Sequence, residues 1–147
     1  MAREEEEMNI AFFLLPKDEV KYLDPESTVR QALEKMKHHR FTSVPLVDDK
    51  GKYAGTLTEG DVLWALEKNL EHADYDHVLQ TRLTDIKQRV RYKPVSITAQ
   101  MEEMIEVITD QNFVPVIDDG KHFIGIIRRR DIIDYFAKKV ARENVQY

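Results

Sequence analysis

The feature that most constrains this chain of 147 residues is an internal repeat. The stretch FTSVPLVDDKGKYAGTLTEGDVLWAL at 41–66 aligns with QNFVPVIDDGKHFIGIIRRRDIIDYF at 111–136, which begins 70 positions later. The matched residues are Val44-Pro45 with Val114-Pro115, Asp48-Asp49 with Asp118-Asp119, Gly55 with Gly125, Asp61 with Asp131, and, upstream, Val20 and Tyr22 with Val90 and Tyr92. Two copies of one supersecondary unit indicate that the chain folds as two related halves.

Each copy predicts the same first elements. An extended lead-in at 19–23 or 89–93 is followed by a helix, because apolar residues recur there at spacings of three and four. The expected helix faces are Val29, Leu33 and Met36 in the first copy, and Met101, Met104, Ile105 and Ile108 in the second. The sequence PEST at 25–28 offers Ser27 and Thr28 as caps of the first helix.

A hairpin and a second helix complete each copy. We expect strands at 44–47 and 53–57, and again at 114–117 and 123–127, around Asp-rich turns at 48–52 and 118–122. The last helix starts near Asp61 or Asp131. Its apolar face is Val62, Leu63 and Leu66 in the first copy, and Ile132, Ile133 and Phe136 in the second. The polar stretch at about 67–82 predicts a helix end and a linker.

The predicted fold class is therefore α+β, with a strand–helix–strand–strand–helix unit that occurs twice. One unit of about 60 residues would leave much of its apolar surface in water, so we expect the two to pack sheet to sheet. The expected organisation is a disordered acidic tail at 1–8, a first repeat at 9–70, a linker at 71–82, a second repeat at 83–142 and a C-terminal tail at 143–147.

Composition excludes several classes of protein. Hydrophobic residues make up 42% and charged residues 33% of the chain, which fits a soluble globular protein. The chain has no cysteine, which excludes disulfides and thiolate metal sites and is compatible with a cytoplasmic location. The net charge of −5 argues against a nucleic-acid partner, although a local basic patch stays possible. The apolar run IAFFLL at 10–15 is too short for a membrane span or a signal peptide.

Thr58 and Asp61 stand where a strand passes into a helix, and two interpretations of this pair stay open. The first is a helix cap, in which the Thr58 hydroxyl and the Asp61 carboxylate satisfy backbone amides of the first turn. The second is a ligand site, because a helix N-terminus with a hydroxyl and a carboxylate can hold the sugar of a phosphate-bearing molecule. Capping and ligand contact can also coexist.

The repeat resembles the cystathionine-β-synthase (CBS) domain, and the pair of copies resembles a Bateman module. The matching residues are TVRQALEKM at 28–36, FTSVPLVDDKGKYAGTLTEGD at 41–61 and NFVPVIDDGKHFIGIIRRRD at 112–131. The resemblance covers roughly 9–140 and implies a stand-alone bacterial or archaeal CBS-domain protein. It also implies tandem β-α-β-β-α repeats with pseudo-two-fold symmetry and an adenosine nucleotide bound in a cleft between them.

The resemblance also implies which residues bind the ligand. Thr58 and Asp61 would contact ribose or phosphate, and Thr42 and Ser43 would line the base or phosphate side. The lead-in around Val20, Lys21 and Tyr22 would cover the base. The full candidate set is Val20, Lys21, Tyr22, Thr42, Ser43, Val44, Pro45, Thr58, Asp61, Val90, Asn112, Phe113, Val114, Pro115, Arg128, Arg130 and Asp131.

The second copy departs from the family pattern of glycine, two apolar residues, threonine or serine, two variable residues and aspartate. Arg128 stands where threonine is expected, and Arg129 and Arg130 follow it before Asp131. This puts a standard ribose contact in doubt. Arginine forks suit phosphate oxygens, so the run could serve phosphates, together with the basic lead-in KQRVRYK at 87–93. A solvated or salt-bridged surface run is about as good an interpretation.

The sequence shows none of the common enzyme motifs, and we expect no catalytic residue. The histidines, which are His38, His39, His72, His77 and His122, show no metal-ligand spacing, so neither a metal site nor a cofactor is predicted. The leading hypothesis is a regulatory module that binds AMP, ADP or ATP, forms a homodimer and signals to that dimer or to another protein. Cyclic di-AMP is a rival ligand, and a purely structural dimerisation module is the alternative of a different class. No membrane partner is expected.

Overall fold

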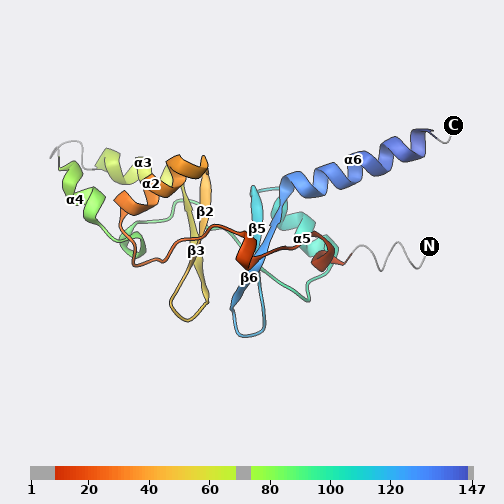
Figure 1. Ribbon diagram of the computed structural model, residues 1–147, viewed down its shortest axis with the longest axis horizontal. Coiled ribbons are helices and arrows are strands. Elements are labelled where there is room, and N and C mark those ends of the chain that lie inside the picture. Colours follow the sequence, from red (N-terminus) through yellow and green to blue (C-terminus); the bar gives the residue numbers. More distant parts are fainter. Residues whose placement is uncertain (1–8, 69–73, 146–147) are drawn as a thin grey trace. The chain divides into compact units, whose positions relative to one another are not determined.

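The computed structural model describes residues 9–68 and 74–145 (Figure 1). Its described residues form two compact units. The first-repeat unit is Lys21–Tyr92, and the second-repeat unit combines the residues up to Val20 with those from Lys93 onward. Both units mix helices with strands, which confirms the α+β class. The predicted tail at 1–8, linker residues 71–73 with His72, and the last two residues of the chain lie outside the described residues.

The first-repeat unit is built on one hairpin (Figure 1). Strands β2 (Ser43–Val47) and β3 (Tyr53–Thr58) pair in antiparallel fashion. Helix α2 (Val29–His39) precedes the hairpin, and α3 (Glu59–Lys68) follows it directly. A short helix α4 (Tyr75–Gln80) and a 3₁₀ turn η3 (Leu83–Asp85) complete the unit.

Most residues of the predicted apolar faces pack into the cores of the two units, but the prediction was wrong for Leu63 and Ile133, which are 64% and 63% exposed. Val29, Ala32 and Met36 of α2 are buried, and Leu33 packs against the same cluster. Thr28 caps α2 in a capping box with Gln31, as the PEST stretch indicated, because its side chain accepts from the Gln31 amide while Gln31 accepts from the Thr28 amide.

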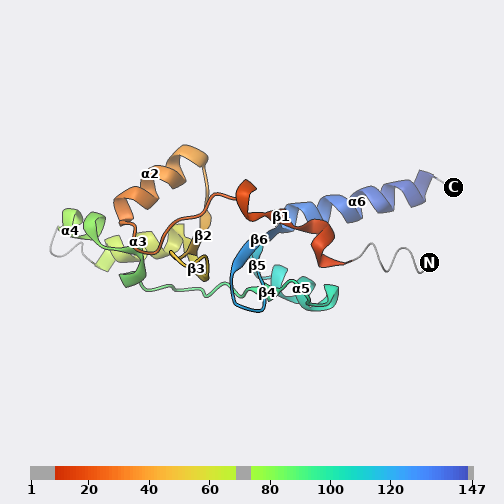
Figure 2. The same cartoon turned by 60° about the horizontal axis from the view of Figure 1, so that its bottom comes forward.

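The second-repeat unit contains a four-stranded sheet with the order β1-β6-β5-β4 (Figure 2). Its hairpin consists of β5 (Phe113–Ile117) and β6 (Phe123–Arg128). Strand β4 (Val95–Ser96) runs parallel to β5, and β1 (Leu15–Pro16) runs antiparallel to β6. The remaining elements are the 3₁₀ turns η1 (Ile10–Phe13) and η2 (Lys17–Glu19) and the helices α5 (Met101–Ile108) and α6 (Arg129–Val145).

Two local predictions need correction. Residues 89–93, which are described, do not form the extended lead-in strand of the second repeat; β4 at Val95–Ser96 does. Leu23 forms a β-bridge with Leu46, and Val95 pairs with Val116. Leu46 and Val116 are 70 positions apart, but Leu23 and Val95 are 72 apart, so the lead-in residues do not share the offset of the hairpins. The predicted linker also contains a helix, because Asp74 caps α4 by accepting from the His77 amide and Val78 is buried in the core.

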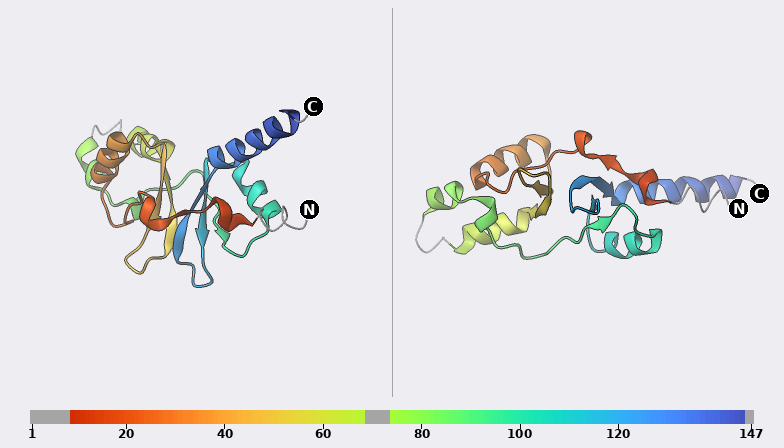
Figure 3. Two further views of the ribbon diagram at one scale, coloured as in Figure 1. Left: turned by 45° about the vertical axis from the view of Figure 1, so that its right-hand side comes forward. Right: turned by 90° about the horizontal axis from the view of Figure 1, so that it is seen from below.

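The compact units also divide the chain differently from the repeats expected at 9–70 and 83–142. Residues 10–20 pack with the second repeat, and 83–92 pack with the first. Gly125, with a φ of +156°, admits the first of these segments, because a Cβ there would lie 2.2 Å from the Leu15 carbonyl oxygen. Gly55, with a φ of +120°, admits the second, because a Cβ would lie 2.4 Å from Gln88 Nε2. The matched glycines therefore make room for a segment that crosses each hairpin; both hairpins are visible in Figure 3.

Candidate ligand-binding site

Thr58 and Asp61 form a reciprocal pair at the start of α3. The Asp61 amide donates to Thr58 Oγ1 at 3.2 Å, and the Thr58 amide donates to Asp61 Oδ2 at 2.9 Å. This is the geometry of a capping box, so the contacts of this pair agree with the capping interpretation. Asp61 has no exposed surface in this structure.

A distant segment completes the surroundings of Asp61. The Arg89 amide donates to Asp61 Oδ1 at 2.8 Å, and the Arg89 guanidinium carbon lies 4.7 Å from the centre of the Trp64 ring. We call Gln88 and Arg89 the strap. Sequence reasoning missed the strap because Arg89 is 28 positions from Asp61. The sequence signal for the strap is Gly55, because the Gln88 side chain lies where a Cβ of any other residue at position 55 would be.

The start of β2 lies beside this pair. Ser43 pairs with Thr58 across the hairpin, and the Glu59 amide donates to the Thr42 carbonyl at 3.0 Å. Thr42 is exposed, while Ser43 and Thr58 are half-buried. The structure therefore brings together Thr42, Ser43, Thr58 and Asp61, as the sequence led us to expect.

The three arginines at 128–130 in the second repeat have different surroundings. Arg128 forms a forked ion pair with Asp131, from Nε to Oδ2 at 2.8 Å and from Nη2 to Oδ1 at 3.3 Å. Arg129 donates to the carbonyls of Ile108 and Thr109, which satisfies the end of α5. Arg130 is exposed. As in the first repeat, the residue before the first hairpin strand lies beside the start of the helix, because the Arg129 amide donates to the carbonyl of Asn112. Asn112 is exposed.

The other candidate residues have different surroundings. Five of them are buried strand residues with a packing role: Val44, Pro45, Phe113, Val114 and Pro115. Val20 is also buried and falls in the second-repeat unit. Val90 is 57% exposed.

Lys21 and Tyr22 line a small pocket of about 210 Å³ in the first-repeat unit. Lys35 and His39 of α2 contribute two further basic side chains, and Phe41 stacks on the His39 ring at 5.3 Å. Desolvation, followed by the charges of His38, Lys21 and Lys35, holds the pKa of His39 below its usual value. No carboxylate lines this pocket, so its charge favours anions.

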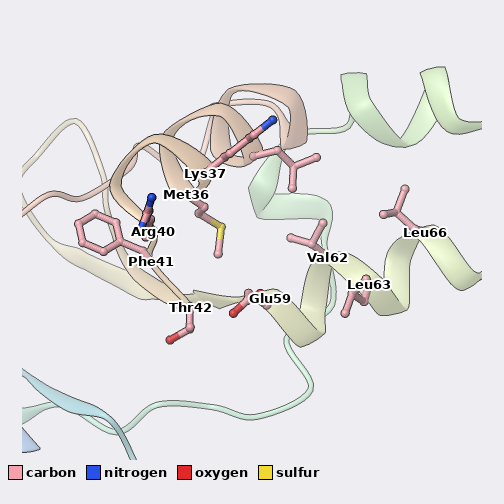
Figure 4. Close-up of a pocket in the computed structure, with 10 residues that line it drawn as sticks. Met36, Lys37, Arg40, Phe41, Thr42, Glu59, Val62, Leu63 and Leu66 are labelled. Carbon is pink, nitrogen blue, oxygen red and sulfur yellow. The ribbon is translucent and has the colours of Figure 1, made fainter.

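A second hollow, the α2–α3 groove, has a volume of about 380 Å³ (Figure 4). Met36 and Val62 lie between the two helices, and Glu59 stands at the start of α3. Lys37 and Arg40 add positive charge from the α2 side. The complete lining is Leu33, Met36, Lys37, Arg40, Phe41, Thr42, Glu59, Val62, Leu63 and Leu66.

Comparison with known proteins identifies the repeated unit. A family described as "CBS domain" matches residues 13–68 and 84–138. A CBS domain-containing protein of Dictyostelium discoideum is 24% identical over 119 residues, which are 77% of this chain and 81% of that protein. An inosine-5'-monophosphate dehydrogenase of Methanocaldococcus jannaschii is 27% identical over 113 residues, which are 76% of this chain but only 20% of that enzyme.

Solved structures show the same fold. A crystal structure of CbpB in complex with c-di-AMP has a TM-score of 0.83 and 22% identity, and the match covers 99% of this chain and 97% of that one. A crystal structure of CBSX2 in complex with AMP has a TM-score of 0.70 and 20% identity, covering 88% of this chain and 96% of that one.

Proposed function

Because the chain belongs to the CBS-domain family and carries two CBS repeats, we propose that it is a regulatory module that binds an adenosine nucleotide. The observation that carries this proposal is the group formed by Thr42, Ser43, Thr58 and Asp61 at the start of α3. Two similar structures support it, since one holds c-di-AMP and the other AMP. The role is one of sensing rather than catalysis.

Asp61 suits a ribose by its chemistry. A carboxylate has about four lone-pair positions, and two backbone amides use only part of them. The remaining positions can accept from the two hydroxyls of a ribose, while amides at the start of α3 face phosphate oxygens. Because Asp61 has no exposed surface here, a nucleotide reaches it only when the strap moves. Ligand binding is thereby coupled to a displacement of Gln88 and Arg89.

Arg128 and Arg130 supply a preference for phosphate charge. Arg130 is exposed, and Arg128 can exchange its partly exposed ion pair with Asp131 for phosphate at little cost, since ion pairs near the surface contribute about 0–1 kcal/mol. We therefore expect ATP or cyclic di-AMP to bind more tightly than adenosine, and their affinity to fall with added salt. Among these ligands, AMP and cyclic di-AMP are the first to test.

Calorimetric titration tests the proposal. Adenosine, AMP, ADP, ATP and cyclic di-AMP are titrated into the protein, with GMP as a control for the base. Binding of at least one adenosine nucleotide with a change in Trp64 fluorescence is expected, because Arg89 leaves the ring when the strap moves. Replacing Arg128 and Arg130 by Gln should remove the preference for phosphate charge. An absence of binding to the whole panel would leave the structural dimerisation module as the function.

That alternative has one observation in its favour. Leu63 of α3 and Ile133 of α6 are large apolar side chains that remain exposed in the units. No helix of the described ranges has the length and apolarity that a membrane crossing needs. Light scattering at tens of micromolar separates the two functions when it is combined with the titrations, because an assembled protein without nucleotide affinity fits only the alternative.

A further inference from the structure

The small pocket of the first-repeat unit gathers basic side chains and no acidic one, and we call it the basic pocket. Lys21 lines it from the lead-in, and Lys35 and His39 line it from α2. All three residues are exposed. Among the described residues, neither lysine forms an ion pair with a carboxylate. Since the whole chain has a net charge of −5, this positive charge is a local feature and does not follow from composition.

The fold holds the side chains of the basic pocket close together. Lys35 and His39 lie on the same face of α2, because they are four positions apart. The His39 ring stacks on Phe41, with 5.3 Å between the ring centres and 22° between the ring planes. Lys21 stands two positions before Leu23, which is bridged to β2. Three basic groups therefore converge on one space that no carboxylate lines.

The corresponding corner of the second repeat is closed by a glutamine. Gln111 stands two positions before β5, as Phe41 stands two positions before β2, and Lys93 precedes β4 as Lys21 precedes the bridged residue of the first repeat. The Gln111 side chain accepts from the Lys93 amide at 2.6 Å and donates to the Lys93 carbonyl at 3.2 Å. Gln111 is only 5% exposed. Hydrogen bonds thus hold this corner together in the second repeat, whereas the first repeat has a pocket there.

The helices differ at the same corner. Lys35 precedes Met36, the last buried residue of α2, and Val107 precedes Ile108, the last buried residue of α5. Val107 packs against the core of the second-repeat unit. The first repeat therefore has a lysine at a pocket where the second repeat has a packed apolar side chain.

We propose that the basic pocket binds a small oxyanion with two negative charges, such as inorganic phosphate, at a site separate from Thr58 and Asp61. Lysine ammonium groups bind phosphate as point charges, and a protonated histidine adds two N–H donors. The pocket volume of about 210 Å³ lies below the roughly 300–1,000 Å³ of pockets that enclose larger organic ligands, so it suits a small anion. Neither Thr58 nor Asp61 lines the pocket, and the inference does not depend on nucleotide binding.

Calorimetric titration with inorganic phosphate at low ionic strength tests the site. Lys35→Gln should weaken phosphate binding by roughly 3- to 10-fold, because it removes one charge from the pocket. Lys37→Gln is the matched control, since Lys37 is exposed on the same helix but lines the α2–α3 groove instead. Saturable binding that Lys35→Gln weakens and the control leaves unchanged supports the proposal. An absence of saturable binding, or equal losses in the two variants, would overturn it.

A competition experiment distinguishes a free anion from the phosphate group of a nucleotide. Phosphate affinity should be the same in the presence of saturating AMP, and the same in Asp61→Asn, because the two sites share no lining residue. Displacement of phosphate by AMP would overturn the proposal, since the pocket would then be part of the nucleotide site.

The pH dependence of sulfate binding tests the role of His39, because sulfate keeps both charges over the whole range. Desolvation, followed by the charges of His38, Lys21 and Lys35, holds the pKa of His39 below its usual value. A bound dianion favours the protonated ring, so sulfate affinity should rise by roughly 3- to 10-fold as the pH falls from about 8 to about 5.5. His39→Gln should abolish this rise. A sulfate affinity independent of pH, or a rise that persists in His39→Gln, would contradict the proposal.

Discussion

Asp61 and Asp131 occupy the same position of two similar repeats, yet their carboxylates have different partners. Asp61 is fully buried and accepts from two backbone amides, one of them from the strap. Asp131 is half-buried and accepts from the Arg128 side chain. The difference follows from one substitution, because Arg128 stands where the first repeat has Thr58. In the second repeat the Arg128 side chain occupies the carboxylate, whereas in the first repeat Thr58 leaves the Asp61 carboxylate to backbone amides.

The largest expected effect is on stability. Asp61→Ala leaves the amides of Thr58 and Arg89 without their acceptor in a buried site, which should cost about 2–4 kcal/mol. Asp131→Ala removes only a partly exposed ion pair and should cost less than about 1 kcal/mol. Urea unfolding of the two variants beside the parent measures both values. Equal losses would show that the two sites are not as different as their contacts indicate.

The next largest difference in stability is expected between alanine variants of the matched glycines, Gly55 and Gly125. Gly125→Ala sets a Cβ against the backbone carbonyl of Leu15, whereas Gly55→Ala meets the flexible end of Gln88. Both positions have a positive φ, so both variants are strained. We expect a loss of about 2–3 kcal/mol for Gly125→Ala and of about 1–2 kcal/mol for Gly55→Ala.

Adding Gln88→Ala serves as the control for this pair. It should relieve part of the Gly55→Ala loss and leave the Gly125→Ala loss unchanged, as thermal unfolding can establish. A larger loss for Gly55→Ala than for Gly125→Ala would contradict the assignment of Leu15 to the second-repeat unit.

Tyr53 and Phe123 form a third matched pair, in which only the first titrates. Burial raises the pKa of Tyr53 to about 12, and its hydroxyl bonds Thr56 at 2.7 Å. The neutral phenol is favoured in the folded protein, so this stability is present below pH 10 and is lost as the pH rises toward 12. Tyr53→Phe should cost about 1 kcal/mol at pH 7 and flatten the loss at high pH. An unchanged profile would mean that other groups govern alkaline unfolding.

The sequence predicted much of this fold because the repeat constrains two copies at once. The hairpins, the helix faces around Met36 and Met104, and the position of the Thr58–Asp61 pair all followed from periodicity and turn chemistry. The lead-in register was wrong, since matching tyrosines at Tyr22 and Tyr92 suggested an offset that the strand pairing of Leu23 and Val95 does not share.

What the sequence could not provide were contacts between distant segments. The strap reaches Asp61 from 28 positions away, and no local pattern encodes that hydrogen bond. The arginine run was ambiguous for a similar reason. Whether Arg129 faces a ligand or the end of α5 depends on where Ile108 and Thr109 present their carbonyls, and only the folded unit determines that.

The central claim is that the first repeat holds the nucleotide through Asp61, and that Asp131 does not serve the same purpose. The most direct measurement is calorimetric affinity for AMP in Asp61→Asn and Asp131→Asn, two isosteric changes that remove one charge each. We predict that Asp61→Asn weakens binding by roughly 1.5–3 kcal/mol, the worth of charged hydrogen bonds, while Asp131→Asn changes it by less than about 0.5 kcal/mol. Equal losses in the two variants, or a loss confined to Asp131→Asn, would contradict the claim.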